Sequence, residues 1–114
     1  MLGLSISLRY FLCCRSVDMR NGFDGLAGLV RNHLKQEPLS GDVFIFINNR
    51  GTHLKLLYWD GDGFALFYKR LERGRFARTV VNDLSVQMSK QELMMLLEGL
   101  SFKEIRRRKR YTHG

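Results

Sequence analysis

The sequence predicts an α+β fold in which a mainly antiparallel sheet of four or five strands is flanked by two helices. Three observations support this prediction. Short apolar runs separated by tight turns follow one another over residues 43–71, residues 26–34 have the apolar spacing of an amphipathic helix, and a capping box opens a second helical stretch at residue 89. The chain of 114 residues has the length of one domain, and its 45% hydrophobic content indicates a folded core.

The first two elements are expected between residues 8 and 41. Residues 8–17 are rich in apolar and aromatic side chains and predict the first strand. Turn and helix-start residues follow, and an amphipathic helix is then indicated by apolar residues at helical spacing, namely Leu26, Leu29, Val30 and Leu34. Pro38, Ser40 and Gly41 are expected to end this helix and to link it to the sheet.

The three central strands are expected at residues 43–47, 52–59 and 64–71. The first is a continuous apolar run, which is typical of a strand that is well covered by the rest of the protein. The turns at residues 48–51 and 60–63 consist of Asn, Asp, Arg and Gly, and most of these tolerate left-handed backbone conformations. Turns this short join antiparallel neighbours, so the segment should form a β-meander.

The last predicted elements are one more strand and a second helix. Leu84, Val86 and Met88 alternate with polar residues, as in a strand. Ser89 and Glu92 form the capping box of a helix that is apolar all round at residues 93–97, so we expect burial on more than one side. Gly99 should stop this helix. We assign residues 1–102 to a single domain and residues 103–114 to a disordered basic tail.

The net charge of +8 is concentrated in two segments, residues 69–78 and 103–114, while the rest of the chain is nearly neutral. Such local concentration suggests a surface that binds a polyanion. For the first segment, a solvated charged edge that discourages strand pairing is the alternative. The candidate nucleic-acid-binding residues are Lys69, Arg70, Arg73, Arg75, Arg78, Arg106, Arg107, Arg108, Lys109 and Arg110.

Aromatic residues alternate with cations in the two strands before the first basic segment. Nucleic-acid-binding sheets use such aromatics to stack bases, and the proposed contact face comprises Tyr58, Trp59, Phe67 and Tyr68. The alternative is that these rings fill the core of a small sheet. Because neighbours along a strand point to opposite faces, Phe67 and Tyr68 cannot both be core in a one-sided sheet.

No catalytic, cofactor-binding or metal-binding residues are expected. The Asp60–Gly63 turn lacks the ligands of a calcium loop, because Phe64 and Leu71 stand where oxygen ligands are needed. The glycines at residues 22, 25 and 28 match no phosphate-binding motif. The three histidines share no ligand spacing with one another or with the cysteines.

The expected compartment is the cytoplasm. Cys13 and Cys14 are adjacent, so they cannot easily form a disulfide with each other, and two free thiols fit a reducing environment. The apolar start of the chain is too short and too interrupted to span a bilayer, and no targeting signal is visible. We therefore expect no membrane partner, and we make no prediction of the oligomeric state.

Three motifs together carry a resemblance to a known family. They are VDMRNGFDGL at residues 17–26, LYWDGDG at residues 57–63 and LFYKRLERGRF at residues 66–76, and MLLEG follows at residues 95–99. In this order and spacing, they resemble the TnpB accessory protein of bacterial insertion sequences of the sixty-six class, the product of the element's second reading frame. The chain departs from the usual pattern at Asn21, where relatives commonly carry Lys or Arg, and in its unusually basic tail.

The resemblance implies a small bacterial protein that assists a separate transposase in moving the element, and it does not concern the RNA-guided nuclease that shares the TnpB name. No catalytic residues are established for this family, so none is transferred to this chain. The leading hypothesis is a non-enzymatic accessory protein that binds DNA, the transposase or both. The alternative is an adaptor that docks on the transposase without direct DNA contact. An undetected nuclease ranks third.

Overall fold

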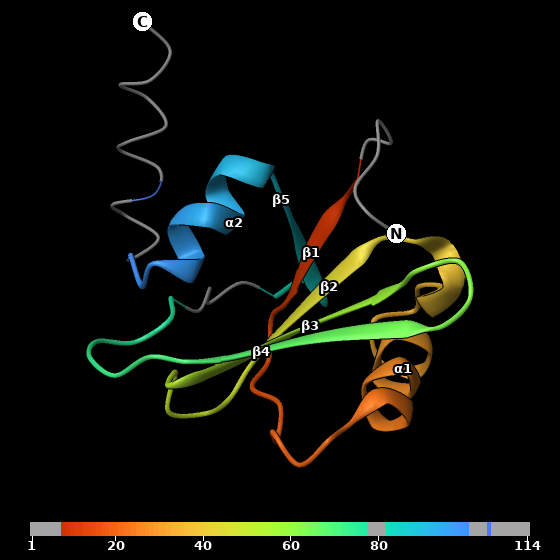
Figure 1. The fold of residues 1–114 in the computed structure, drawn as a ribbon, viewed down its shortest axis with the longest axis horizontal. Helices are drawn as coiled ribbons and strands as arrows, with labels where there is room; N and C mark the ends of the chain where they lie inside the picture. Colours follow the sequence, from red (N-terminus) through yellow and green to blue (C-terminus); the bar gives the residue numbers. More distant parts are fainter. Residues whose placement is uncertain (1–7, 78–81, 101–104, 106–114) are drawn as a thin grey trace, which may run out of the picture.

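The computed structural model describes residues 8–77, 82–100 and 105, which form a five-stranded sheet with one helix packed on each face (Figure 1). The predicted α+β fold is confirmed. In chain order, the elements are β1 (Tyr10–Cys13), α1 (Phe23–Asn32), the 3₁₀ turn η1 (Pro38–Ser40), β2 (Val43–Ile47), β3 (His53–Trp59), β4 (Phe64–Arg70), β5 (Ser85–Met88) and α2 (Lys90–Leu97).

The strands lie in the order β4-β3-β2-β1-β5. Strands β2, β3 and β4 form the predicted antiparallel meander. Strand β1 pairs parallel to β2, with Tyr10 opposite Val43, and antiparallel to β5, with Tyr10 opposite Met88. A parallel pair needs a long crossover connection, and α1 lies within the connection from β1 to β2. The sheet is therefore mixed, although most of its pairs are antiparallel.

Strand β2 is the centre of the core, and all five of its residues are buried. Its side chains alternate between the two faces. Phe44 and Phe46 pack in the cluster that contains Leu26 and Val30 of α1. Ile45 and Ile47 pack instead in the cluster that contains Leu93 and Leu96 of α2. The continuous apolar run in the sequence is thus explained by helices that cover both faces of the sheet.

Helix α2 begins with the predicted capping box, because the Ser89 hydroxyl accepts from the Glu92 N–H and the Glu92 carboxylate accepts from the Ser89 N–H. Gly99 follows the helix with a φ of 85°, a conformation that favours glycine. The expected burial on more than one side holds in part, because Leu93 and Leu96 are buried and Met95 and Leu97 pack against the same cluster, whereas Met94 is 55% exposed. The apolar residues at positions 93–97 cover more of the helix than the core can bury.

Ile105 is fully buried in the cluster on the α2 side of the sheet. The sequence assigned this residue to the basic tail, whereas the structure makes it part of the core. The other residues of the predicted tail lie outside the described residues. Among the helices of the described part, none is long and apolar enough to cross a membrane.

Candidate nucleic-acid interface

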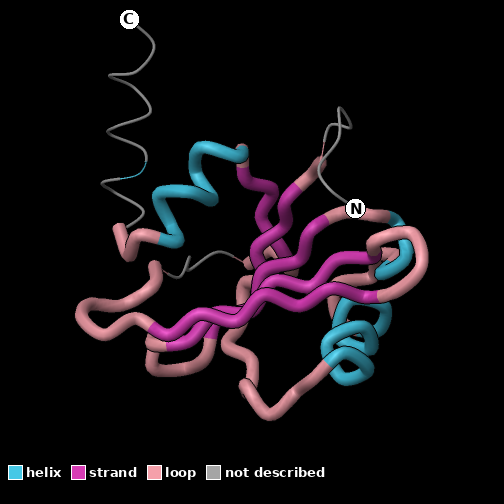
Figure 2. The backbone as a smooth tube through the Cα atoms, viewed as in Figure 1, coloured by secondary structure: helices cyan, strands magenta, loops and turns pink. Residues whose placement is uncertain are grey.

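The loop that follows β4, residues 71–77, folds back against the turn between β2 and β3. The Leu71 N–H donates to the Thr52 carbonyl at 3.0 Å, and the Phe76 N–H donates to the Gly51 carbonyl at 2.7 Å. The Phe76 side chain is only 3% exposed and packs in the core. Phe76 therefore anchors a loop whose other side chains are largely solvent-exposed, and Figure 2 shows this loop and the β2–β3 turn at the same end of the sheet.

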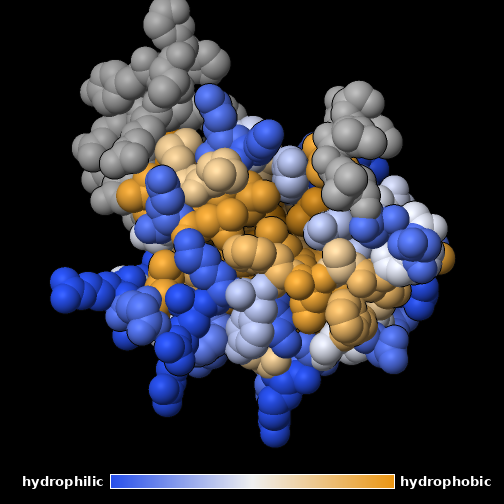
Figure 3. All heavy atoms as spheres, in the orientation of Figure 1, coloured by the Kyte–Doolittle hydropathy of each residue, from blue (hydrophilic) through white to orange (hydrophobic). Residues whose placement is uncertain are grey.

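Gly51 allows this close approach. Its φ is +73°, and a Cβ atom built there would lie 3.2 Å from the Phe76 carbonyl oxygen and 3.3 Å from the Arg75 Cβ. Arg75 therefore lies against the turn that carries Arg50. The exposed arginines from the turn, from the end of β4 and from the loop form one cationic surface, which we call the basic edge: Arg50, Arg70, Arg73 and Arg75. Hydrophilic residues project prominently at this end of the molecule in Figure 3.

Two of the predicted cations have partners within the protein. The Nε of Arg70 contacts the Glu72 carboxylate at 2.9 Å, and both side chains are mostly exposed. Exposed pairs of this kind contribute little, so a phosphate can compete with Glu72 for Arg70. The Nζ of Lys69 donates to the Leu97 carbonyl at 2.8 Å, at the C-terminal end of α2, where a cation is favoured. Lys69 thus ties α2 to β4.

The remaining predicted cations lie outside the described residues, and they are Arg78, Arg106, Arg107, Arg108, Lys109 and Arg110. Within the described part, the cationic surface consists of two predicted loop residues, Arg73 and Arg75, together with Arg70 and Arg50. The sequence motifs did not single out Arg50, because a lone Arg in a turn has no signal until the loop after β4 is seen to pack beside it.

The predicted aromatic residues do not form one surface. The pairing of Tyr58 with Ala65 and of Leu56 with Phe67 places Tyr58 and Phe67 on the face that α2 covers in part. Trp59 and Tyr68 lie on the α1 face, where Trp59 packs edge-on against Phe64 at a centroid distance of 5.1 Å. Tyr58 and Trp59 are partly buried, whereas Phe67 is 43% exposed and Tyr68 is 53% exposed.

Lys55 supports the Tyr68 ring from within the protein. Its side chain is buried, and its Nζ donates to the carbonyls of Met19 at 2.7 Å and Asn21 at 2.8 Å. The same ammonium lies 4.7 Å from the centroid of the Tyr68 ring. Lys55 therefore connects the segment before α1 to the β3–β4 hairpin, and its charge is directed inwards rather than towards a ligand.

A hollow opens beside Tyr68 on the same face and is lined by His53, Tyr68, Arg70 and Glu72. The His53 and Tyr68 rings lie 5.8 Å apart between centroids. The hollow brings an exposed aromatic ring next to an arginine and an imidazole. Sequence reasoning missed His53, because a single histidine at the start of a strand resembles many structural histidines.

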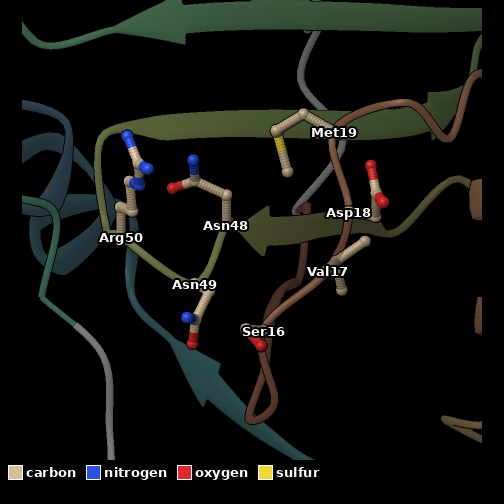
Figure 4. Close-up of a pocket in the computed structure, with 7 residues that line it drawn as sticks. All are labelled: Ser16, Val17, Asp18, Met19, Asn48, Asn49 and Arg50. Atoms are coloured by element: carbon tan, nitrogen blue, oxygen red, sulfur yellow. The ribbon is translucent and has the colours of Figure 1, made fainter.

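A second hollow lies beside the β2–β3 turn, between residues 16–19 and residues 48–50 (Figure 4). In this view Met19 extends towards Asn48, while Arg50 lies at the rim. Asp18 and Arg20 form an exposed ion pair with an N–O distance of 2.7 Å, and hydrogen bonds from Arg20 lower the pKa of Asp18 to about 2. The hollow is polar and carries charges of both signs.

The described residues offer little for covalent or metal chemistry. Over residues 8–77, 82–100 and 105, no three His, Cys, Asp or Glu side chains group in a way that could hold a metal ion. Burial raises the pKa of the Cys13 and Cys14 thiols, which keeps them protonated and poorly nucleophilic. The basic edge and the Tyr68 ring beside Arg70 are together suited to binding an anionic, aromatic ligand.

Comparisons with known proteins give one consistent result. A family model described as "IS66 Orf2 like protein" matches residues 8–107. The chain is 38% identical over 108 residues to the uncharacterized protein y4jC of Sinorhizobium fredii, covering 95% of this chain and 92% of that protein. It is 37% identical over 103 residues to the uncharacterized protein y4hO of the same organism, covering 90% of each chain. No solved structure matches the chain.

Proposed function

The chain belongs to the family of IS66 Orf2-like proteins, and we propose that it is a non-enzymatic accessory protein of an insertion sequence that assists transposition by binding DNA. The family membership supports a role with the mobile element and its transposase. The observation that carries the DNA-binding part of the proposal is the basic edge. We place this activity in the bacterial cytoplasm, where the element and the transposase meet.

The basic edge has the chemistry of a phosphate-binding surface. Arg50, Arg73 and Arg75 are exposed, and guanidinium groups bind phosphate oxygens with two parallel hydrogen bonds. The loop that carries two of these residues is fixed at both ends by backbone hydrogen bonds to the β2–β3 turn and by the buried Phe76. An anchored loop loses less conformational entropy on binding than a free one, which favours binding.

The salt dependence of DNA binding tests this proposal. Neutralising one phosphate contributes a log–log slope of about −0.9, so replacing Arg73 and Arg75 by Ala should make the slope shallower by about 2. It should weaken binding to all DNA sequences alike, because phosphate contacts do not read bases. Fluorescence anisotropy with labelled element ends over a range of salt concentrations gives the slope.

The salt-dependence experiment requires a chain in which the positive charges of the tail are removed while its residues are kept. A chain cut near residue 102 would lose Ile105, which is fully buried in the core. We therefore place Gln at the five tail positions Arg106, Arg107, Arg108, Lys109 and Arg110 in the full chain. The matched control in this background is Arg31→Ala with Lys90→Ala, which removes two exposed cations from α1 and the start of α2. An equal change of slope in this control would contradict a specific role of the basic edge.

The adaptor function remains the second candidate, because Phe67 is 43% exposed on the α2 side of β4, an edge strand of the sheet. One experiment with the tail-neutralised chain distinguishes the two functions. If the protein does not bind DNA at low salt and still binds purified transposase, the adaptor function is favoured. A Phe67→Ala variant should then fail to bind the transposase, whereas the variant with Arg73→Ala and Arg75→Ala should still bind it.

We further propose that the protein has no nuclease activity of its own. The described residues contain no cluster that could hold a catalytic metal ion. The purified protein should leave plasmid and element-end DNA intact with or without magnesium. Cleavage that copurifies with the protein and disappears when Asp60 or Asp62 is replaced by Asn would contradict this proposal.

A further inference from the structure

The α1 face of the β3–β4 hairpin is divided into a covered half and an open half. Four cross-strand pairs lie along it: Trp59–Phe64, Leu57–Leu66, Lys55–Tyr68 and His53–Arg70. Leu57, Leu66 and Phe64 pack in the cluster with Leu26 and Val30 of α1, so α1 covers the first half. The second half ends in Tyr68, which is 53% exposed, and in the hollow next to it.

The Tyr68 ring is held from one side. Lys55 lies 4.7 Å from the ring centroid and is itself fixed by the carbonyls of Met19 and Asn21. A cation over an aromatic ring is attracted by the ring's negative face. Since Lys55 is buried and Tyr68 is more than half exposed, the ring presents its remaining surface to solvent in a fixed position. A planar ligand can stack on it without first ordering the side chain.

The His53 ring is also fixed in position. The Asn48 side-chain oxygen accepts from the backbone N–H groups of Thr52 and His53, so its amide nitrogen faces the His53 Nδ1 at 3.3 Å. The Thr52 hydroxyl lies closer to the same Nδ1, at 2.7 Å, so two neighbours hold this edge of the ring. The hollow is thus lined by the imidazole of His53 and by the guanidinium of Arg70.

From these contacts we propose that the open half of the hairpin binds single-stranded DNA, with one base stacked on Tyr68 and the neighbouring phosphate held by Arg70 and His53. This inference rests on the proposed function and specifies the form of DNA. In a duplex the faces of the bases are covered by their neighbours, so an exposed ring beside a cation is useful mainly to an unpaired nucleotide. Arg50, Arg73 and Arg75 at the same end of the sheet then follow the backbone of the strand.

Binding of one labelled oligonucleotide, as a single strand and as a blunt duplex of the same sequence, tests the inference with the full chain. We expect tighter binding of the single strand at equal salt. Tyr68→Leu should weaken single-strand binding by about 5-fold to 150-fold, the loss typical of one stacked base, and should leave duplex binding unchanged. Tyr68→Phe, which keeps the ring, should bind within about twofold of the original. The matched control is Phe67→Leu, which removes the exposed ring of the opposite face.

A second measurement does not depend on the variants. Photo-crosslinking of a single strand that carries 5-iodouracil, followed by peptide mass spectrometry, should identify Tyr68 as the attachment site. Equal losses for single strand and duplex in Tyr68→Leu, or crosslinks confined to the loop at residues 71–77, would overturn the stacking site while leaving DNA binding by the basic edge intact. The absence of binding to either form would overturn the proposed function together with this inference.

Discussion

One end of the β3–β4 hairpin lies beside α1 (Figure 1), where Phe64 packs against the cluster that contains Leu26 and Val30, and the other end carries His53 and Arg70 on the same face outside that cluster. The backbone pairing is continuous from one end to the other, so the two ends differ in their side chains and in what packs on them. At the covered end the side chains contribute to stability. At the open end an aromatic ring, an imidazole and an arginine remain accessible, which is where a ligand can bind.

The comparison also shows how the open end stays ordered without a helix over it. Lys55 and the carbonyls of residues 19 and 21 fix the middle of the face, and the Gly51 contact with Phe76 fixes the loop beyond it. These are individual hydrogen bonds and one buried ring rather than a broad apolar contact. We therefore expect the two ends to respond differently to substitution.

The largest expected difference is in stability. Leu57 at the covered end is fully buried, so Leu57→Ala should lower the free energy of unfolding by about 2–5 kcal/mol. Tyr68→Leu at the open end should cost less than about 1 kcal/mol, because the ring is more than half exposed. Urea unfolding followed by circular dichroism measures both. Equal losses would show that the open end is part of the core.

A smaller effect is expected where the two halves meet. Lys55→Met removes the donor to two carbonyls and should cost about 1–3 kcal/mol. Amide exchange at residues 19–22 should become faster, since this segment loses its anchor. Lys69→Met is the matched control, because its ammonium also donates to a carbonyl but is only partly buried, and it should cost about 0.5–1.5 kcal/mol.

The β2–β3 turn provides the next test. Gly51→Ala should cost about 1–2 kcal/mol, because the residue has a φ of +73° and its new Cβ would meet the Phe76 carbonyl. Gly28→Ala in α1 is the control, since a Cβ there has nothing within 4 Å and alanine is the better helix former. In thermal unfolding, Gly51→Ala should lower the melting temperature and Gly28→Ala should raise it. A neutral Gly51→Ala would mean that the loop does not need this close contact.

The smallest expected effect concerns the pH dependence of the segment before α1. Arg20 lowers the pKa of Asp18 to about 2 from 3.8, so the contribution of this pair is complete above pH 3.8 and is lost as the pH falls through 2. Carbon-detected NMR titration of the Asp18 carboxyl should show this midpoint. Arg20→Ala should raise it but leave it below 3.8, because the backbone N–H at residue 20 still donates to Asp18. An unchanged midpoint would exclude the side-chain pair as the cause.

The elements that local patterns determine were predictable from the sequence. Residues 43–47 form β2 with the predicted bounds, the two short turns join β2, β3 and β4 as a meander, and Ser89 with Glu92 caps α2. Each of these depends on residues close together in the chain. The fold class followed from them, and so did the exposure of some aromatic surface, because Phe67 and Tyr68 lie on opposite faces of one strand.

The contacts that join distant segments were not predictable. Nothing local indicates that β1 pairs parallel to β2, that Lys69 reaches the last turn of α2, or that Ile105 is buried. The candidate site, too, was predictable only where it depends on residues close together in the chain. The composition indicated the cations of the loop at residues 71–77, whereas Arg50 and His53 joined them only because Phe76 and the strand pairing bring those segments together.

The position of β1 between β2 and β5 has a consequence for synthesis of the protein. The meander of β2, β3 and β4 is complete at residue 70, but the second neighbour of β1 is made only when the ribosome reaches residues 85–88. At about 5–20 residues per second, synthesis from residue 70 to residue 88 takes roughly one to four seconds, and one edge of β1 stays unpaired throughout that time. A reading frame interrupted between these points would release a chain whose β1 edge stays open to other strands. Insertion sequences in which this reading frame is truncated between residues 70 and 85 should therefore produce protein fragments that aggregate rather than fragments with partial activity.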